Sequence, residues 1–163
     1  MRFSHMLALI AAAALPAAAV AHVVPLKNNA GASAGSVDLI AAPKGLLIKV
    51  DATGLTPGWH AIHIHEKADC SDAAFKMAGA HTHSATPAAH GLLNPAANDT
   101  GDLPNIYAGA DGTAKAELFT TLTMMAPLHD ADGSAIVIHA KADDYTTQPI
   151  GGAGDRVACG AFK

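Results

Sequence analysis

The sequence has few charged residues, only two cysteines and no long amphipathic helix. Charged residues make up 15% of the chain, and the formal net charge is −4. Lysine and arginine are scattered along the sequence, which argues against nucleic acid and anionic membrane surfaces as partners. The sequence contains neither a His-Glu-x-x-His pattern nor a nucleophile elbow, which weakens the case for a zinc hydrolase built on its histidines.

The only long apolar run lies at the N-terminus and is too short for a membrane span. Residues 6–14 are apolar, and Pro16 interrupts the run before the ~18 residues that a span needs. Arg2 precedes the run and Ala19-Val20-Ala21 follows it, as in a secretory signal peptide. We therefore expect a signal peptide over residues 1–21, no stable membrane anchor, and a mature domain over 22–163. A cut after Ala19 is the alternative.

Cys70 and Cys159 are the two cysteines of the chain. Export places them in an oxidising compartment, where an even pair is most simply a disulfide. Two buried free thiols are the alternative.

Glycine, proline, asparagine and aspartate divide the sequence into short β-rich runs. This pattern predicts an all-β antiparallel sandwich or barrel, and periodicity does not choose between them. The expected strands are 23–27, 35–41, 46–52, 60–66, 105–108, 113–120, 134–140 and 156–159.

Two segments, 69–103 and 142–155, lack strand character and are too long for ordinary connections. The longer one carries five potential ligands, so we expect a metal to order it. These residues are His81, His83, His90, Asp99 and Asp102.

Histidine is abundant, with ten residues in the chain. His63 and His65 are two apart on a predicted strand and therefore face the same side, as a chelating pair suited to copper, zinc, iron or nickel. His139 ends another predicted strand, and His81 in the long loop would complete a four-imidazole set suited to copper. His81, His90 and Asp102 form a second group whose atoms suit zinc.

Six ordered blocks of the sequence resemble the copper/zinc superoxide dismutases, and in particular their bacterial periplasmic branch. The blocks extend over nearly the whole mature chain. They are GWHAIHIHE (58–66), AGAH (78–81), HG (90–91), GDLPN (101–105), VIHAKADD (137–144) and GDRVACG (154–160).

The resemblance implies an eight-stranded antiparallel Greek-key barrel, sandwich-like, with two long functional loops. It implies one copper and one zinc per subunit, a monomer or homodimer, and a periplasmic location. The implied copper ligands are His63, His65, His81 and His139, and the implied zinc ligands are His81, His90 and Asp102. Arg156 would attract superoxide, Asp143 would orient ligands of both metals, and Cys70 would pair with Cys159.

The implied reaction is the dismutation of superoxide to O2 and H2O2. Copper would alternate between Cu(II) and Cu(I), and His81 would bridge to a structural zinc and carry a proton between the two steps. Lys76 and Lys141 are candidates for a positive funnel that steers the substrate. The alternative is a non-enzymatic periplasmic protein that binds or delivers copper on the same fold.

Two departures from the family pattern fall on the zinc side. Asp99 stands where the family usually has a histidine, and His83 follows the bridging residue where the family has Asn-Pro nearby. Asp99, water or His83 would complete the zinc site, and zinc would be held less tightly than in relatives.

The remaining histidines receive plainer interpretations. His60 has the opposite strand parity to His63 and is expected to be structural. His129 is expected to be solvated. His22 is expected at a disordered mature N-terminus, with copper chelation by its amine and ring as the alternative.

Overall fold

The computed structural model describes residues 21–163, so the predicted signal peptide lies, apart from Ala21, outside the described residues. Two short helical segments, η1 (Lys76–Ala78) and α1 (Met125–Leu128), accompany nine strands. The strands are β1 (Ala21–Asn28), β2 (Ser33–Ala42), β3 (Gly45–Ala52), β4 (Gly58–His60), β5 (Ile62–His65), β6 (Ile106–Ala108), β7 (Ala114–Thr120), β8 (Ser134–His139) and β9 (Arg156–Phe162). Within residues 21–163, no helix is long and apolar enough to cross a membrane.

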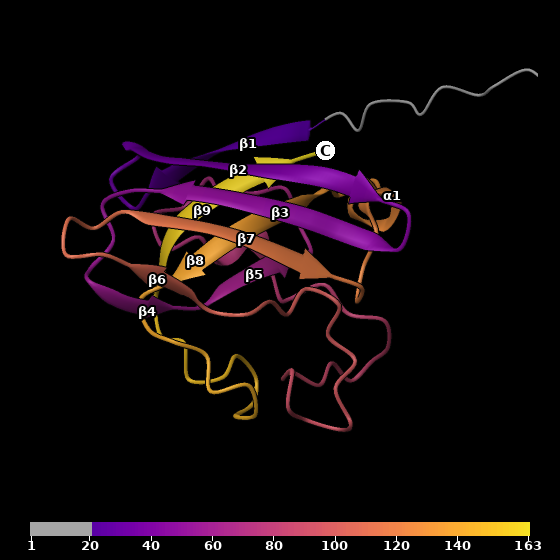
Figure 1. The fold of residues 1–163 in the computed structure, drawn as a ribbon. Coiled ribbons are helices and arrows are strands. Elements are labelled where there is room, and N and C mark those ends of the chain that lie inside the picture. The colour runs from indigo at the N-terminus through magenta and orange to yellow at the C-terminus, as the bar shows by residue number, and fades with distance from the viewer. Residues whose placement is uncertain (1–20) are drawn as a thin grey trace, which may run out of the picture.

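Seven strands form one curled antiparallel sheet in the order β5-β8-β9-β1-β2-β3-β7, and β4 pairs with β6 (Figure 1). β4 continues into β5, and β6 leads through a tight turn into β7, so the β4–β6 pair lies between the two ends of the sheet. The predicted all-β antiparallel fold is confirmed. The connections from β3 to β4 and from β7 to β8 pass over intervening strands, as in a Greek key.

The predicted strand 60–66 is divided in two at Ala61. The Ala61 amide donates to the Lys141 carbonyl (2.8 Å), and the Ala61 carbonyl accepts from the His139 amide (2.9 Å). Ala61 therefore bonds toward the end of β8 while β4 turns away to pair with β6. Taken as one bent strand, β4 and β5 complete the eight strands expected.

Side chains of β5 and β8 are buried on both faces, although only one face contributes to the main core. Ile62 and Ile64 point into that core together with residues of the other strands. The alternate residues His63 and His65 lie on the outer face and are also fully buried. The two long loops extend from one side of the sheet and cover this face (Figure 1).

A small apolar cluster fastens the first loop to the sheet. Cys70 and Cys159 form a disulfide with a Cα–Cα distance of 5.9 Å, which confirms the predicted pairing. Phe75 is buried in the same cluster and packs with Val137 of β8. The disulfide thus joins the loop to β9, three residues from Arg156.

Candidate metal centre

The edge of β5 positions ligands from the first loop through backbone hydrogen bonds. The loop runs along β5, which places His81 opposite His65 and Asp102 opposite His63 in isolated β-bridges. Ile64 receives a bond from Thr82 N and donates to Gly101 O, each at 2.9 Å. An added Cβ on Gly101 would lie 2.1 Å from the Ile64 carbonyl oxygen, so this close pairing requires glycine.

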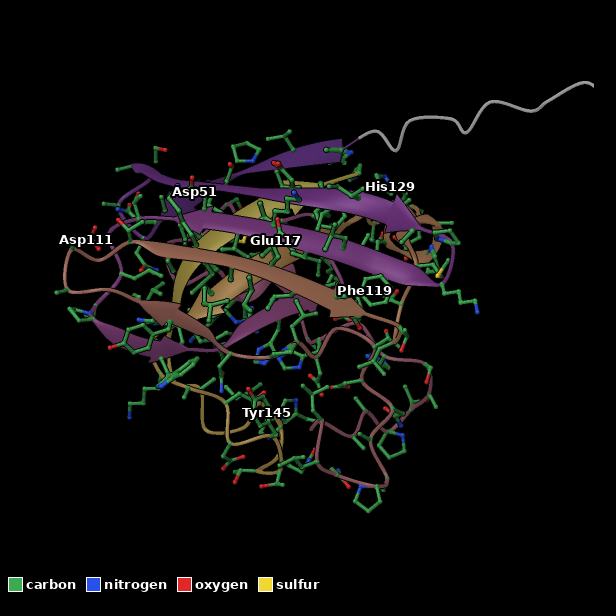
Figure 2. The ribbon with its side chains drawn as sticks, in the orientation of Figure 1. Asp51, Asp111, Glu117, Phe119, His129 and Tyr145 are labelled. Carbon is green, nitrogen blue, oxygen red and sulfur yellow. A yellow bond between two sulfur atoms is a disulfide. The ribbon has the colours of Figure 1, made fainter. Side chains whose placement is uncertain are left out.

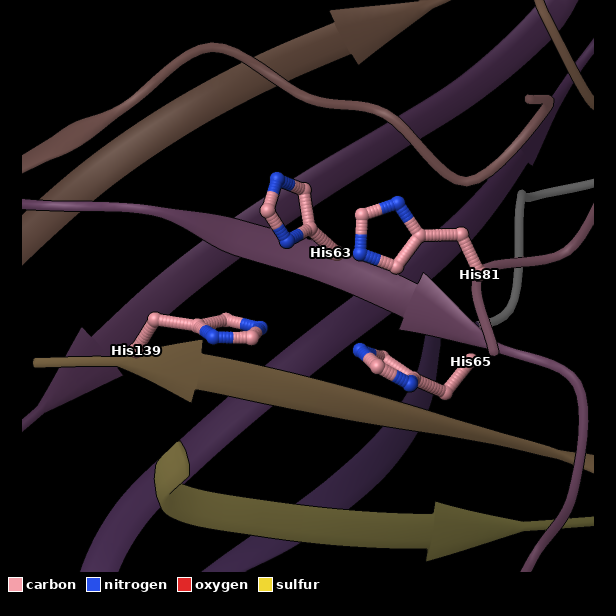
Figure 3. A group of neighbouring side chains, drawn as sticks. All are labelled: His63, His65, His81 and His139. Carbon is pink, nitrogen blue, oxygen red and sulfur yellow. The ribbon is translucent and has the colours of Figure 1, made fainter. Parts of the chain in front are cut away.

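Four imidazoles converge on one point between β5, β8 and the loop (Figure 3). Their ligand atoms lie within 4.8 Å of one another, and all four side chains are buried. The set consists of His63, His65, His81 and His139.

Each of the three strand-borne rings makes a hydrogen bond through one nitrogen, and this bond orients the other nitrogen toward the common point. His63 Nε2 donates to Asp143, His65 Nδ1 to Gly79 O, and His139 Nδ1 to Gly154 O. In the described part of the chain, the remaining ring nitrogens of these residues and His81 Nε2 have no hydrogen-bond partner. A buried acceptor without a partner is costly. Four such atoms facing one point fit a bound transition metal.

The strand-borne imidazoles are kept neutral. Burial lowers the pKa of His63 to about 4 and that of His139 to about 3, and it also lowers the pKa of His65. A neutral imidazole keeps a lone pair available for a metal ion.

A second group of ligands lies on the other side of His81. His81 Nδ1 donates to Asp102 Oδ1 (3.0 Å) and Asp99 Oδ2 (3.1 Å). His90 Nδ1 lies 2.8 Å from Asp102 Oδ1 and 3.6 Å from Asp99 Oδ2. These two nitrogens and two oxygens suit a tetrahedral zinc site. His63 also has a ligand atom within 4.8 Å of His81, His90 and Asp102.

Protons balance the charge of this second group. Burial alone would lower the pKa of His90, but the carboxylates of Asp102, Asp143 and Asp99 outweigh it and raise the pKa to about 11. The pKa of His81 is also raised, because its bonds to Asp102 and Asp99 outweigh burial. The same bonds outweigh the effect of burial on Asp102 and lower its pKa. The group is therefore a buried cluster of carboxylates that attracts positive charge.

Asp143 connects the two groups from behind. Its Oδ2 accepts from His63 Nε2 (3.0 Å) and its Oδ1 from His90 Nε2 (3.1 Å). The Tyr145 amide donates to Oδ1 at 2.6 Å, and the Asn105 side chain holds the Asp143 backbone on both sides. No sequence pattern assigned a role to Asn105 or Tyr145. The block that contains Asn105 was the only signal for either residue.

Arg156 is held beside the four imidazoles by the first loop. Its guanidinium donates to the carbonyls of Phe75 (2.5 Å) and Gly79 (2.7 Å). Gly79 O also accepts from His65, so one carbonyl links the arginine to the histidine cluster. Arg156 lines a pocket of about 330 Å³ together with His81. Lys76 lines an adjoining pocket that also contains Arg156.

Three other predicted histidines lie outside both groups. His60 is 1% exposed, and its Nδ1 and Nε2 lie 2.7 Å from the carbonyl oxygens of His139 and Thr56, which agrees with its predicted structural role. His83 Nδ1 donates to the backbone of His81 at 2.9 Å. His22 is half-buried and ordered within β1, so the expectation of a disordered residue is wrong.

The fold and the two groups of ligands define a β-barrel protein with a buried double metal centre. Residues 33–162 match the family model of the copper/zinc superoxide dismutases. A Cu-Zn superoxide dismutase of Caulobacter vibrioides is 56% identical over 144 residues, which cover 85% of this chain and 83% of that one. The chain belongs to the copper/zinc superoxide dismutase family.

Solved structures agree with this assignment. A P104H mutant of a superoxide dismutase-like protein from Bacillus subtilis superposes with a TM-score of 0.80 at 36% identity, covering 87% of this chain and 98% of that one. The Cu/Zn superoxide dismutase of Brucella abortus gives a TM-score of 0.75 at 28% identity, with 88% and 100% covered.

Proposed function

We propose that the protein dismutates superoxide to O2 and H2O2 in the periplasm. The observation that carries this proposal is the set of four buried imidazole nitrogens that converge without partners beside Arg156. The Cys70–Cys159 disulfide supports an oxidising compartment. The subunits act as monomers or homodimers.

Two separate sets of donor atoms would bind copper and zinc. His63, His65, His81 and His139 would hold copper through the atoms that lack hydrogen bonds. His81 Nδ1, His90 Nδ1, Asp99 and Asp102 would hold zinc, since oxygen and nitrogen donors in this number suit that ion. His81 would contribute Nε2 to copper and Nδ1 to zinc.

Copper, when bound, supplies one-electron chemistry, and zinc supplies fixed charge without redox activity. Arg156 attracts the superoxide anion and orients it in the pocket, because its cation is held by two carbonyls and has no carboxylate partner among the described residues. His81 holds a proton at Nε2 between the two half-reactions. Asp143 keeps the rings of His63 and His90 oriented.

The test is superoxide turnover by protein that carries measured amounts of copper and zinc. We expect turnover that depends on copper and is inhibited by cyanide. Arg156→Lys keeps the charge without the two-carbonyl geometry, and Arg156→Ala removes both. Loss of rate that grows from lysine to alanine, with unchanged copper content, supports the role of Arg156 in substrate attraction.

A copper-binding or copper-delivery protein is the competing function. It would take up copper at the same four histidines and show no turnover. Stoichiometric copper with a dismutation rate no higher than that of free buffer would therefore favour delivery and refute the proposed enzyme activity.

A further inference from the structure

Two histidines outside the metal centre lie side by side in space, at the end of the barrel where β1 begins. The ring centroids of His22 and His129 are 5.2 Å apart, and the ring planes are inclined at 68°. Phe162 contacts both rings, with centroid distances of 5.7 and 5.8 Å. His129 follows α1 at the end of the molecule where β1 begins (Figure 2). Distant parts of the sequence thus bring two imidazoles together on the surface.

This spacing matches that of imidazoles whose nitrogens converge on the predicted zinc position. His81 and His90 have centroids 5.2 Å apart and an interplanar angle of 73°. A centroid separation of this size allows one nitrogen of each surface ring to reach a common ion.

The fold holds the pair without burying it. His22 is paired opposite Leu39 within the β1–β2 ladder, so its backbone is fixed before any ligand binds. The buried ring of Phe162 (5% exposed) packs against both imidazoles. His129 is exposed, so a cation there keeps contact with water and incurs little desolvation cost.

The predicted signal cleavage adds a third nitrogen. A cut before His22 makes it the first residue of the mature chain and places an α-amine next to its own imidazole. The ordinary pKa of an α-amine, near ~8, allows a metal to displace its proton at neutral pH. An amine and two imidazoles are nitrogen ligands of the kind that favours Cu(II), which also stands highest in the order of divalent-metal affinity.

We infer that the mature protein carries a second, surface site for Cu(II), formed by the His22 amine, the His22 imidazole and the His129 imidazole. This site shares no residue with the double metal centre. It rests on cleavage before His22 and is independent of superoxide turnover.

Titration of the exported protein with glycine-buffered Cu(II), after the double metal centre is filled with copper and zinc, tests the inference. Intact mass first establishes the N-terminus. We expect one additional copper per chain and a difference electron paramagnetic resonance spectrum of tetragonal Cu(II) with nitrogen ligands. Nickel(II) should bind the same site more weakly and zinc should compete poorly.

Substitutions distinguish this pair from adventitious binding. His22→Gln and His129→Gln should each weaken the additional copper at least about tenfold, which corresponds to about 1.4 kcal/mol. Because both remove the same site, the double variant should bind little worse than either single variant. His83→Gln, which removes a histidine outside the cluster, should bind the additional copper as the wild type does.

Three results would overturn the inference. The first is a mature chain that begins at another residue. The second is the absence of additional copper from a chain that begins at His22. The third is additional copper that His129→Gln retains, because the amine and His22 would then suffice.

Discussion

The two halves of the proposed metal centre meet at His81 but have opposite electrostatics. On the copper side, burial lowers the pKa of three strand-borne rings, which remain neutral. On the zinc side, two carboxylates pair with two imidazoles, and the carboxylates favour the protonated form of the imidazoles. The copper side therefore depends on rigid strands, and the zinc side depends on charge balance within a loop.

Loss of a ligand that belongs only to the copper side should have the largest effect. His139→Ala removes the ring at the end of β8 and should lower copper affinity and turnover by more than ~100-fold, since loss of an outer partner alone costs about 10–100-fold. Zinc content should stay close to that of the wild type. Metal analysis and superoxide turnover check this, and a parallel loss of zinc would show that the halves are not separable.

Asp143→Asn should weaken both halves, because Asp143 bonds to one ring on each side. The amide can accept one hydrogen bond but presents a donor to the other imidazole, so one ring loses its orientation. We expect affinity to fall by about 10–100-fold for at least one metal. Competition with chelators of known affinity measures each metal separately. Unchanged affinity for both would exclude the orienting role.

Asp99→His should strengthen the zinc side by roughly tenfold and leave copper unchanged, because it replaces one of two buried carboxylates with a neutral nitrogen donor. Asp99→Asn is the matched control, since it removes the charge without adding an imidazole, and it should bind zinc more weakly than the wild type. Dialysis against a mild chelator compares the three proteins. Equal zinc retention in Asp99→Asn and wild type would show that Asp99 is not a ligand.

The smallest expected effect is a difference in proton release. At pH 7, His63 (pKa about 4) and His139 (pKa about 3) are already neutral, so copper displaces no proton from these rings. His90 has a pKa of about 11 and holds a proton that zinc must displace. Zinc affinity should therefore rise about tenfold per pH unit for each proton displaced, with more protons released by zinc than by copper.

Calorimetry of the metal-free protein in two buffers with different ionisation enthalpies measures these protons. Metal-loaded protein provides the blank. Equal release by the two metals would contradict the difference in charge between the two sides.

The sequence predicted the common face of His63 and His65 well because strand periodicity is local. His63 and His65 are two residues apart, so their common face follows from β geometry wherever the strand lies. It predicted the division of residues 60–66 poorly, since the break at Ala61 depends on the distant Lys141 carbonyl. The ordered His22 and its contact with His129 were also missed, because no local pattern joins residues so far apart.

By itself, the sequence determined the chemical types of the donors, their order along the chain and the family resemblance, because these depend only on residue identity and spacing. The tertiary structure alone decided which oxygens face His81 and His90, and it placed Asp99 rather than His83 beside them. It also decided that the carbonyl of Gly79 serves both Arg156 and His65. These arrangements arise where a loop pairs with the free edge of β5, and such contacts are set by packing between distant segments.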